Sequence, residues 1–369
     1  MRHKYIDIKL KDKVTDLVNN SFLVKNLSRK KFISHFILGM IESRSVVFCE
    51  VASFLNDGAK SISNEKRIQD FFREVKLDYN HLISFLVKLL PSGSVTLCID
   101  RTDWQFGKVK INVLALVACV KDFHIPLYWE LLDNKGGCSS NTDRKDLLEK
   151  VIPLLGVERI KLVIGDREFV GHQWLEYLYS RGIAFCVRVP KNHHITDKNG
   201  EIWTLEELLW NKKKARRSKC VVDGVVGNVF AKRLDGEEFL FIFGTVPTEE
   251  LEATYKQRWT IECFFQNIKG RGFDLEKTHL KNITKIKTLI ALIAIAYTIC
   301  FALGYFYHHQ VCNIPLKKHK YKAYSFFRKG LDIIREIVKN KPFYPFFDTF
   351  WSYITNLLSI NSDFLKKAG

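Results

Sequence analysis

The sequence contains no C-x-x-C pair, although nine of its 369 residues are cysteines. An odd number of scattered cysteines argues against a disulfide-stapled scaffold and favours a reducing compartment. The eleven histidines show no metal-binding spacing, so a zinc site is not indicated either. The cysteines are Cys49, Cys98, Cys119, Cys138, Cys186, Cys220, Cys263, Cys300 and Cys312.

The sequence also lacks the marks of a secreted or repetitive protein. The segment Met1–Asp7 has no apolar stretch of a secretory signal peptide, so we expect a cytoplasmic protein. Internal repeats and low-complexity segments are absent, which argues against a repeat solenoid.

Acidic residues are few relative to basic ones. Lys and Arg number 58 against 40 Asp and Glu, which gives a net charge of +18. A surplus of this size predicts a polyanionic partner, and nucleic acid is the first candidate. A basic protein at the ribosome or at a membrane surface is the alternative.

The apolar run Thr288–Tyr307 is long enough to span a bilayer. It is rich in Ala, Ile and Tyr, with lysines before it and the His308-His309 pair after it. We therefore interpret it as a helix that is buried inside a large domain, with no membrane partner.

Residues 1–90 predict a helical region. Apolar positions recur at helical spacing through Phe32–Met40, and Asn56–Gly58 breaks the pattern. Ser61 or Ser63 is expected to cap the next helix. A helix, turn and helix are compatible with a DNA-reading motif and also with an ordinary helical pair.

The pattern changes after Pro91. Three successive strands, then strands alternating with helices, predict a mixed α/β sheet with helices on its faces. The expected strands are Val95–Ile99, Val109–Val120, Ile125–Leu131, Ile160–Ile164 and Ala184–Val189.

A mostly β insertion is expected at about residues 195–247, with hairpin-turn signals at Asp223-Gly224 and Asp235-Gly236. Its basic run is either a solvated loop or a phosphate contact. That run comprises Lys212, Lys213, Lys214, Arg216, Arg217 and Lys219.

After Leu280 the chain is expected to be helical. Its aromatic tail either packs on the protein's own core or forms a dimer surface, and the sequence leaves both interpretations open. The tail includes Phe343, Tyr344, Phe346, Phe347, Phe350 and Trp351.

The stretch Tyr255–Lys269 predicts one helix with two faces. At about 100° per residue, its polar positions form a stripe roughly 80° wide. The polar positions are Tyr255, Arg258, Glu262, Gln266 and Lys269, and the core-facing ones are Ile261, Phe264, Phe265 and Ile268. Gly270 and Gly272 are expected to end the helix.

Two predicted strands lead into an aspartate, at Ile99-Asp100 and Gly165-Asp166. If these strands are neighbours, the two carboxylates lie side by side at the carboxyl ends of the strands, where sites form. Glu262, on a helix packed against the sheet, would be the third carboxylate. Three hard oxygen donors suit Mg²⁺ or Mn²⁺, and two such ions can promote in-line phosphoryl displacement. Each aspartate by itself could equally be an ordinary turn residue.

The spacing Tyr-(2)-Arg-(3)-Glu-(6)-Lys resembles the signature of the insertion-sequence-4 family of bacterial DDE transposases. Asp100-Arg-Thr102 resembles that family's first-aspartate motif, and Asp166-Arg-Glu-Phe169 resembles its second. The similarity spans roughly residues 40–310. Glu168, inside the second motif, is expected to pair with Arg167 or a neighbouring basic residue.

The resemblance implies a cut-and-paste transposase with a ribonuclease-H-like core, two divalent ions (Mg²⁺ or Mn²⁺) and a homodimer that holds paired element ends. Residues matching the metal-binding and catalytic triad are Asp100, Asp166 and Glu262. Residues matching the DNA-contacting positions are Tyr255, Arg258 and Lys269. Candidates for an aromatic that holds a flipped base are Trp104, Trp129 and Trp259.

The expected organisation has three parts. A helical DNA-binding domain in residues 1–90 precedes a catalytic domain in residues 91–310, which contains the insertion. Residues 311–369 form a helical region with a candidate dimer surface. Two alternatives stay open: a ribonuclease-H-like nuclease without strand transfer, and a catalytically silent DNA-binding protein.

Overall fold

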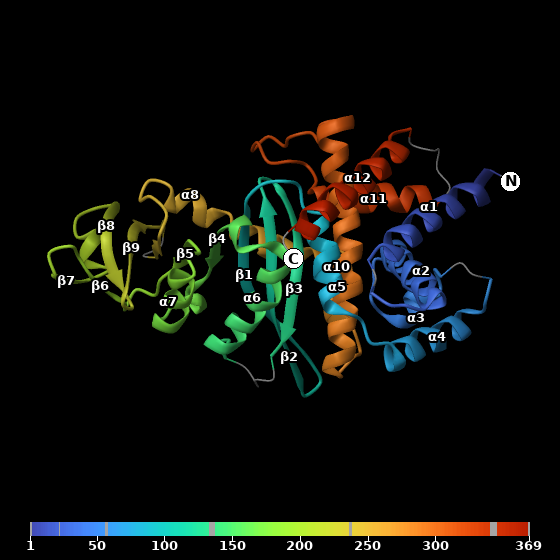
Figure 1. Ribbon diagram of the computed structural model, residues 1–369, viewed down its shortest axis with the longest axis horizontal. Coiled ribbons are helices and arrows are strands. Elements are labelled where there is room, and N and C mark those ends of the chain that lie inside the picture. The colour runs from blue at the N-terminus through green and yellow to red at the C-terminus, as the bar shows by residue number, and fades with distance from the viewer. Residues whose placement is uncertain are drawn as a thin grey trace.

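The structure, a computed structural model, describes residues 2–21, 23–55, 58–132, 137–235, 238–339 and 345–367, with side chains from Leu10 to Ser359. Asn56, Asp57, Gly236, Phe343 and Tyr344, which entered the predictions above, lie outside the described residues. The described chain forms one large mixed sheet, with helices before and after it (Figure 1).

Helices fill the described part of the N-terminal region, as predicted. They are α1 (Arg2–Asn19), α2 (Leu27–Ser43), α3 (Phe48–Ala52), α4 (Ser61–Glu74) and α5 (Tyr79–Lys88). Their core is aromatic, and the rings of Phe32 and Phe71 lie 4.7 Å apart. The predicted cap of α4 is wrong: Lys60 occupies the N-cap position without a side-chain cap bond, and the Ser61 hydroxyl contacts Ser53 instead.

The first half of the sheet follows the predicted order. Strands β1 (Val95–Phe106), β2 (Val109–Val120) and β3 (Phe123–Leu131) form an antiparallel meander. Strands β4 (Ile160–Gly165) and β5 (Phe185–Arg188) join it in parallel, so β1 and β4 are neighbours, as the carboxylate prediction requires. The crossovers contain α6 (Asn141–Leu155) and α7 (His172–Ser180).

The β insertion extends the same sheet. Strand β10 pairs with β5, which makes the sheet ten-stranded in the order β3-β2-β1-β4-β5-β10-β9-β8-β6-β7. Much of the basic run therefore lies on strand β8 and not on a loop. The added strands are β6 (His194–Thr196), β7 (Ile202–Thr204), β8 (Lys214–Val222), β9 (Val225–Arg233) and β10 (Phe239–Gly244).

The helices that follow the sheet are α8 (Leu251–Lys256), α9 (Trp259–Ile268), α10 (Ile283–Phe306), α11 (Phe326–Val338) and α12 (Phe346–Lys367). Short helical turns are η1 (Val157–Arg159), η2 (Arg167–Phe169), η3 (Glu207–Leu209), η5 (Leu275–Lys277) and η6 (Tyr307–Val311).

Helix α10 contains the long apolar run and packs beside the sheet (Figure 1). Within the described residues, Ile283–Val311 is the one helix whose length and composition suit a membrane span, and 94% of its apolar window is buried. The buried position agrees with the prediction for this run. A Cβ on Gly304 would lie 1.8 Å from the carbonyl oxygen of Phe326, so glycine allows α10 and α11 to touch through their backbones.

The described part of the aromatic tail packs on the protein's own core. Phe347, Phe350 and Trp351 are buried, and the ring of Phe350 lies 5.7 Å from that of Phe306 on α10. These contacts favour the packing interpretation of the tail, while a dimer surface stays a prediction.

Candidate active site

The two aspartates lie where the parallel pairing of β1 and β4 ends. The last paired residues are Cys98 on β1 and Ile164 on β4, and Asp100 and Asp166 follow them. The prediction that the first strand ends at Asp100 is wrong, because β1 loses β4 as a neighbour there but keeps its ladder with β2 as far as Phe106. The prediction was correct for the parallel pair of strands, which is what brings the aspartates together.

A tight turn takes the chain from β4 into η2. A Cβ on Gly165 would lie 2.6 Å from the Cβ of Phe169, so only glycine allows this close approach. Asp166 has an extended backbone at the start of the turn, and Phe169 is fully buried behind it. The buried phenyl ring thus anchors the segment that carries Asp166.

The predicted single helix from Tyr255 to Lys269 is interrupted. It forms α8 and α9, joined through Gln257 and Arg258 by i→i−3 bonds such as that from the Arg258 N–H to the Tyr255 carbonyl, at 3.0 Å. The predicted core face is buried as expected. Lys269 lies one residue beyond α9, with a non-helical ψ of −130°. The tightened turn keeps Tyr255, Arg258 and Glu262 on one side.

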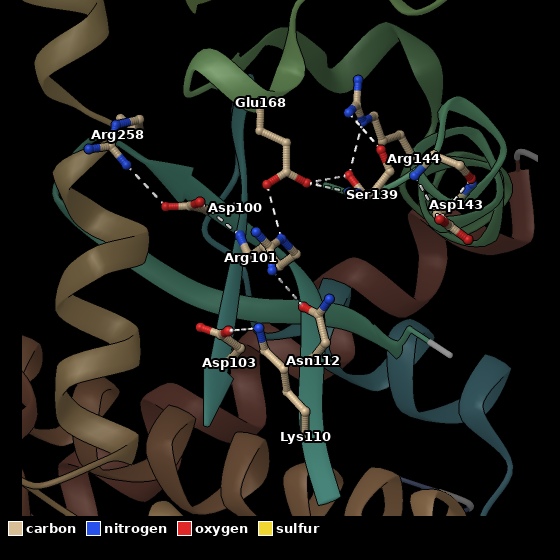
Figure 2. Close-up of polar contacts among 11 residues, drawn as sticks. Asp100, Arg101, Asp103, Lys110, Asn112, Ser139, Asp143, Arg144, Glu168 and Arg258 are labelled. Carbon is tan, nitrogen blue, oxygen red and sulfur yellow. Dashed lines mark hydrogen bonds and ion pairs between the residues drawn. The ribbon is translucent and has the colours of Figure 1, made fainter. Parts of the chain in front are cut away.

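The guanidinium of Arg258 lies between two of the three carboxylates. Its Nη1 donates to Asp100 Oδ2 at 3.0 Å (Figure 2), and its Nη2 bonds closely to Glu262 Oε1. The Arg258 side chain is only 15% exposed. Burial opposes its charge, but Tyr255, Asp166, Asp100 and Glu262 together raise the pKa of Arg258 above its ordinary value. Arg258 is therefore a fixed positive charge at the centre of the site.

Tyr255 holds the third carboxylate. Its hydroxyl donates to Asp166 Oδ1 at 3.2 Å, and its ring is packed against Arg258. Burial, followed by the charge of Asp166, raises the pKa of Tyr255 above its ordinary value, so the hydroxyl keeps its proton and stays a donor. Tyr255 is 8% exposed, so its ring presents little surface for stacking on a base in this arrangement.

The carboxyl of Asp100 is destabilised in its charged form. Burial is the largest cause and raises the pKa of Asp100 to about 6, with smaller contributions from the charges of Asp166 and Glu262. The Arg101 N–H, which donates to Asp100 Oδ1 at 2.7 Å, and the Arg258 guanidinium act in the opposite direction. The charges of Asp166 and Glu262 thus act on Asp100, so the three carboxylates share one electrostatic environment.

Lys269 lies in the same hollow as the carboxylates. Its Nζ contacts the Asp103 carbonyl at 3.2 Å and Glu276 Oε1 at 2.7 Å. The hollow has a volume of about 530 Å³. It is lined by Asp100, Arg101, Thr102, Glu262, Phe265, Gln266, Lys269, Gly270 and Arg271.

The three carboxylates are not arranged as a ready metal cage. Among the residues that the structure describes, no group of three or more His, Cys, Asp or Glu side chains is close enough to hold a metal ion. Asp100 and Glu262 instead share the Arg258 guanidinium.

The exposure of the three candidate tryptophans differs. Trp129 and Trp104 are 1% and 7% exposed, whereas Trp259, next to Arg258, is 58% exposed. Of these three rings, Trp259 alone presents a large surface to solvent.

Sequence reasoning missed two groups of residues around this site. One is a hollow of about 340 Å³ whose lining includes Arg167, Arg188 and Lys191. Arg188 could have been found from the sequence, because it is a cation at the end of a predicted strand. It lies at the end of β5, as Asp100 and Asp166 lie at the end of the parallel pairing of β1 and β4. The other is the ion pair between Arg101 and Glu168, shown in Figure 2. Glu168 was expected to pair with Arg167 or a neighbouring basic residue, and its partner is Arg101.

A mixed sheet that brings carboxylates together at the ends of adjacent parallel strands defines the class of this protein as an α/β protein with an acidic site. The family model for the transposase DDE domain matches residues 91–299, more than half of the chain, and the chain belongs to this family. The match supports an enzyme that acts on DNA and transposase activity in general.

The other comparisons add little. No curated protein matches the sequence. Among solved structures, the chain is similar to an endonuclease V from Bacillus subtilis, with 11% identity over 57% of this chain and 95% of the other. The TM-score is 0.27, so no argument rests on this likeness. The observed mixed sheet is compatible with a ribonuclease-H-like fold.

Proposed function

We propose that this protein is a transposase of the insertion-sequence-4 type, which cleaves DNA strands at the ends of its element and transfers them into target DNA. One observation carries the proposal. The paired side chains of Tyr255 and Arg258 bind all three carboxylates, although these come from distant parts of the chain. The signature residues and the triad therefore form one unit.

Mg²⁺ or Mn²⁺, as two ions, is the proposed cofactor, and Asp100, Asp166 and Glu262 would hold it. The donor set fits, since all three side chains offer hard oxygens and the buried Asp100 needs a cation beside it. When bound, the ions activate the attacking water or 3′-hydroxyl and stabilise the leaving oxygen. Arg258 would compete with the ions for Asp100 and Glu262, because its guanidinium bonds one oxygen of each carboxylate.

The basic residues around the carboxylates supply a path for the DNA backbone. A released Arg258 guanidinium can hold a phosphate next to the cleaved bond through two parallel bonds. Lys269 lies in the same hollow and suits another phosphate. Arg167, Arg188 and Lys191 line a further hollow and extend the path beyond Asp166. The proposal includes a homodimer on paired ends in the cytoplasm.

The decisive experiment combines cleavage and joining. Purified protein is incubated with Mg²⁺, DNA carrying the element ends that flank its gene, and a supercoiled target plasmid. Joined products support the transposase, because a ribonuclease-H-like nuclease releases cut ends alone. Binding without cleavage would identify the catalytically silent alternative. Asp122→Ala, in the turn between β2 and β3, is the matched control that should keep full activity.

A further inference from the structure

Glu168 has no assigned role in the proposed reaction, but both of its carboxylate oxygens are hydrogen-bonded. Its Oε2 accepts from Arg101 Nε at 3.0 Å, and its Oε1 accepts from both the N–H and the hydroxyl of Ser139, each at 2.6 Å (Figure 2). The carboxylate is 14% exposed and its partner Arg101 is 20% exposed. A carboxylate shielded to this degree holds its partners in fixed positions.

The partners of Glu168 belong to the segments that surround the two aspartates. Arg101 directly follows Asp100 on β1, and its Nη1 also bonds to Asn112 on β2 at 3.1 Å. Ser139 precedes α6 and is held in turn by the buried Arg144, whose Nη2 donates to the Ser139 carbonyl at 2.7 Å. Glu168 itself lies in η2, two residues after Asp166. One carboxylate thus ties together β1, the η2 turn and the segment before α6.

The position of this ion pair matters because the β1–β4 ladder brings the two strands together but ends before it reaches the aspartates. The β1–β4 ladder ends at Cys98 and Ile164, and β1 continues while the chain leaves β4 into η2. Beyond that point, no ladder bond sets the separation of Asp100 and Asp166. The ion pair between Arg101 and Glu168 joins the two segments after they separate, with Arg101 on β1 and Glu168 in η2.

The link that Arg258 and Tyr255 make between the two aspartates differs from the Glu168 link. Arg258 and Tyr255 join Asp100 and Asp166 through the aspartate side chains themselves. Those bonds use carboxylate oxygens that the proposed ions would also need, so ion binding competes with them. The Glu168 bonds leave the carboxylates of Asp100 and Asp166 untouched, so they can persist through the reaction.

We infer that Glu168 is a positioning residue, which with Arg101 sets the distance between the carboxylates of Asp100 and Asp166. This inference rests on the proposed function. Glu168 touches neither reacting atoms nor the aspartate side chains, and it acts through the backbones of β1 and η2.

The test compares Glu168→Gln and Glu168→Ala with the wild-type protein. Glutamine keeps an acceptor for Ser139 but loses the ion pair with Arg101. Binding of Mn²⁺ is measured by electron paramagnetic resonance without DNA, and cleavage is titrated with Mn²⁺. We expect Glu168→Ala to raise the half-saturating Mn²⁺ concentration about tenfold or more in both measurements. Glu168→Gln should raise it less. Both variants should bind element-end DNA with an affinity within about threefold of wild type.

Glu130→Gln is the matched control, because Glu130 is also a carboxylate in an ion pair, with Lys287 at 2.7 Å, but lies on the edge strand β3, separated from β1 by β2. It should leave Mn²⁺ binding unchanged. Arg101→Ala should resemble Glu168→Ala, and the double variant should be no worse than either alone.

A merely structural role would give a different result. If Glu168→Ala lowers the melting temperature but binds Mn²⁺ normally at temperatures where it is folded, the inference is overturned. If Asp166→Ala retains normal Mn²⁺-dependent cleavage, the proposed function itself fails. Loss of cleavage in Asp166→Ala together with wild-type Mn²⁺ binding in Glu168→Ala would overturn only the positioning role.

Discussion

Arg258 Nη1 lies 3.0 Å from Asp100 Oδ2, so a cation from the turn between α8 and α9 neutralises a carboxylate carried by the central strand. The same guanidinium binds Glu262 one turn further along α9. Arg258, a proposed DNA-contacting residue, is thus in direct contact with two residues of the proposed triad. The predictions below follow from this arrangement and from the charges around it.

The first prediction concerns the triad. Asp100→Ala, Asp166→Ala and Glu262→Gln should each reduce strand cleavage by about 1,000-fold or more, which corresponds to roughly 4 kcal/mol of activation free energy. The reason is that each variant removes one proposed ion ligand. Cleavage of labelled element-end DNA with Mg²⁺ measures the loss, and gel-shift affinity should stay nearly unchanged. Near-normal cleavage by any one variant would show that the substituted residue is not a member of the triad.

The second prediction uses the raised pKa of Asp100. Its folded pKa of about 6 exceeds the unfolded value of 3.8, so the proton stabilises the fold below pH 3.8 and this contribution is lost as the pH rises through 6. Asp100→Asn should therefore stabilise the metal-free protein at pH 8 by about 1–3 kcal/mol.

Urea unfolding in the presence of a chelator, at pH 8 and at pH 4, measures this effect. The gain should shrink toward zero at pH 4, where the wild-type carboxyl is largely protonated. An equal gain at both pH values, or a loss at pH 8, would contradict the assigned electrostatic cause.

The third prediction concerns the cation at the centre. Arg258→Ala leaves Asp100 and Glu262 without their shared partner, so the melting temperature without metal should fall. Mn²⁺ should then raise the melting temperature more in the variant than in the wild type, because the ligands are no longer occupied.

Thermal unfolding with and without Mn²⁺ is the measurement. Arg328→Ala is the control, since Arg328 pairs with Asp332 on α11 and should show the wild-type Mn²⁺ response. An equal Mn²⁺ response in Arg258→Ala and wild type would mean that Arg258 does not compete with the ions.

The fourth prediction concerns Lys269. If Lys269 contacts a phosphate, Lys269→Ala should weaken DNA binding across sequences and reduce the salt slope by about one unit. Binding isotherms between low and moderate salt give the slope. Lys277→Ala is the control, because Lys277 is exposed, pairs with Asp274 and lies outside the carboxylate hollow. If Lys269→Ala leaves the salt slope of DNA binding unchanged, Lys269 does not contact a phosphate.

The sequence by itself determined the local elements and the identity of the candidate site. Strand β2 was predicted correctly, because a continuous apolar run is a local signal. The buried face of α9 followed from helical periodicity. The proposed triad came from two aspartates that follow predicted strands and from the fixed spacing of Tyr255, Arg258, Glu262 and Lys269. Both features can be seen in one sequence without an alignment.

Only the tertiary structure decided which side chains meet. The bonds from Arg258 to Asp100, from Tyr255 to Asp166 and from Glu168 to Arg101 join residues far apart in the chain, and sequence periodicity carries no information on such pairs. The pairing of β10 with β5, which merges the insertion into the sheet, is equally non-local. The break at Gln257 and Arg258 has the same character, because Tyr255 before it bonds to Asp166 and Arg258 within it bonds to Asp100. The burial of each side chain and the distances between charges depend on packing, so the pKa shifts at the site could be derived only from the fold.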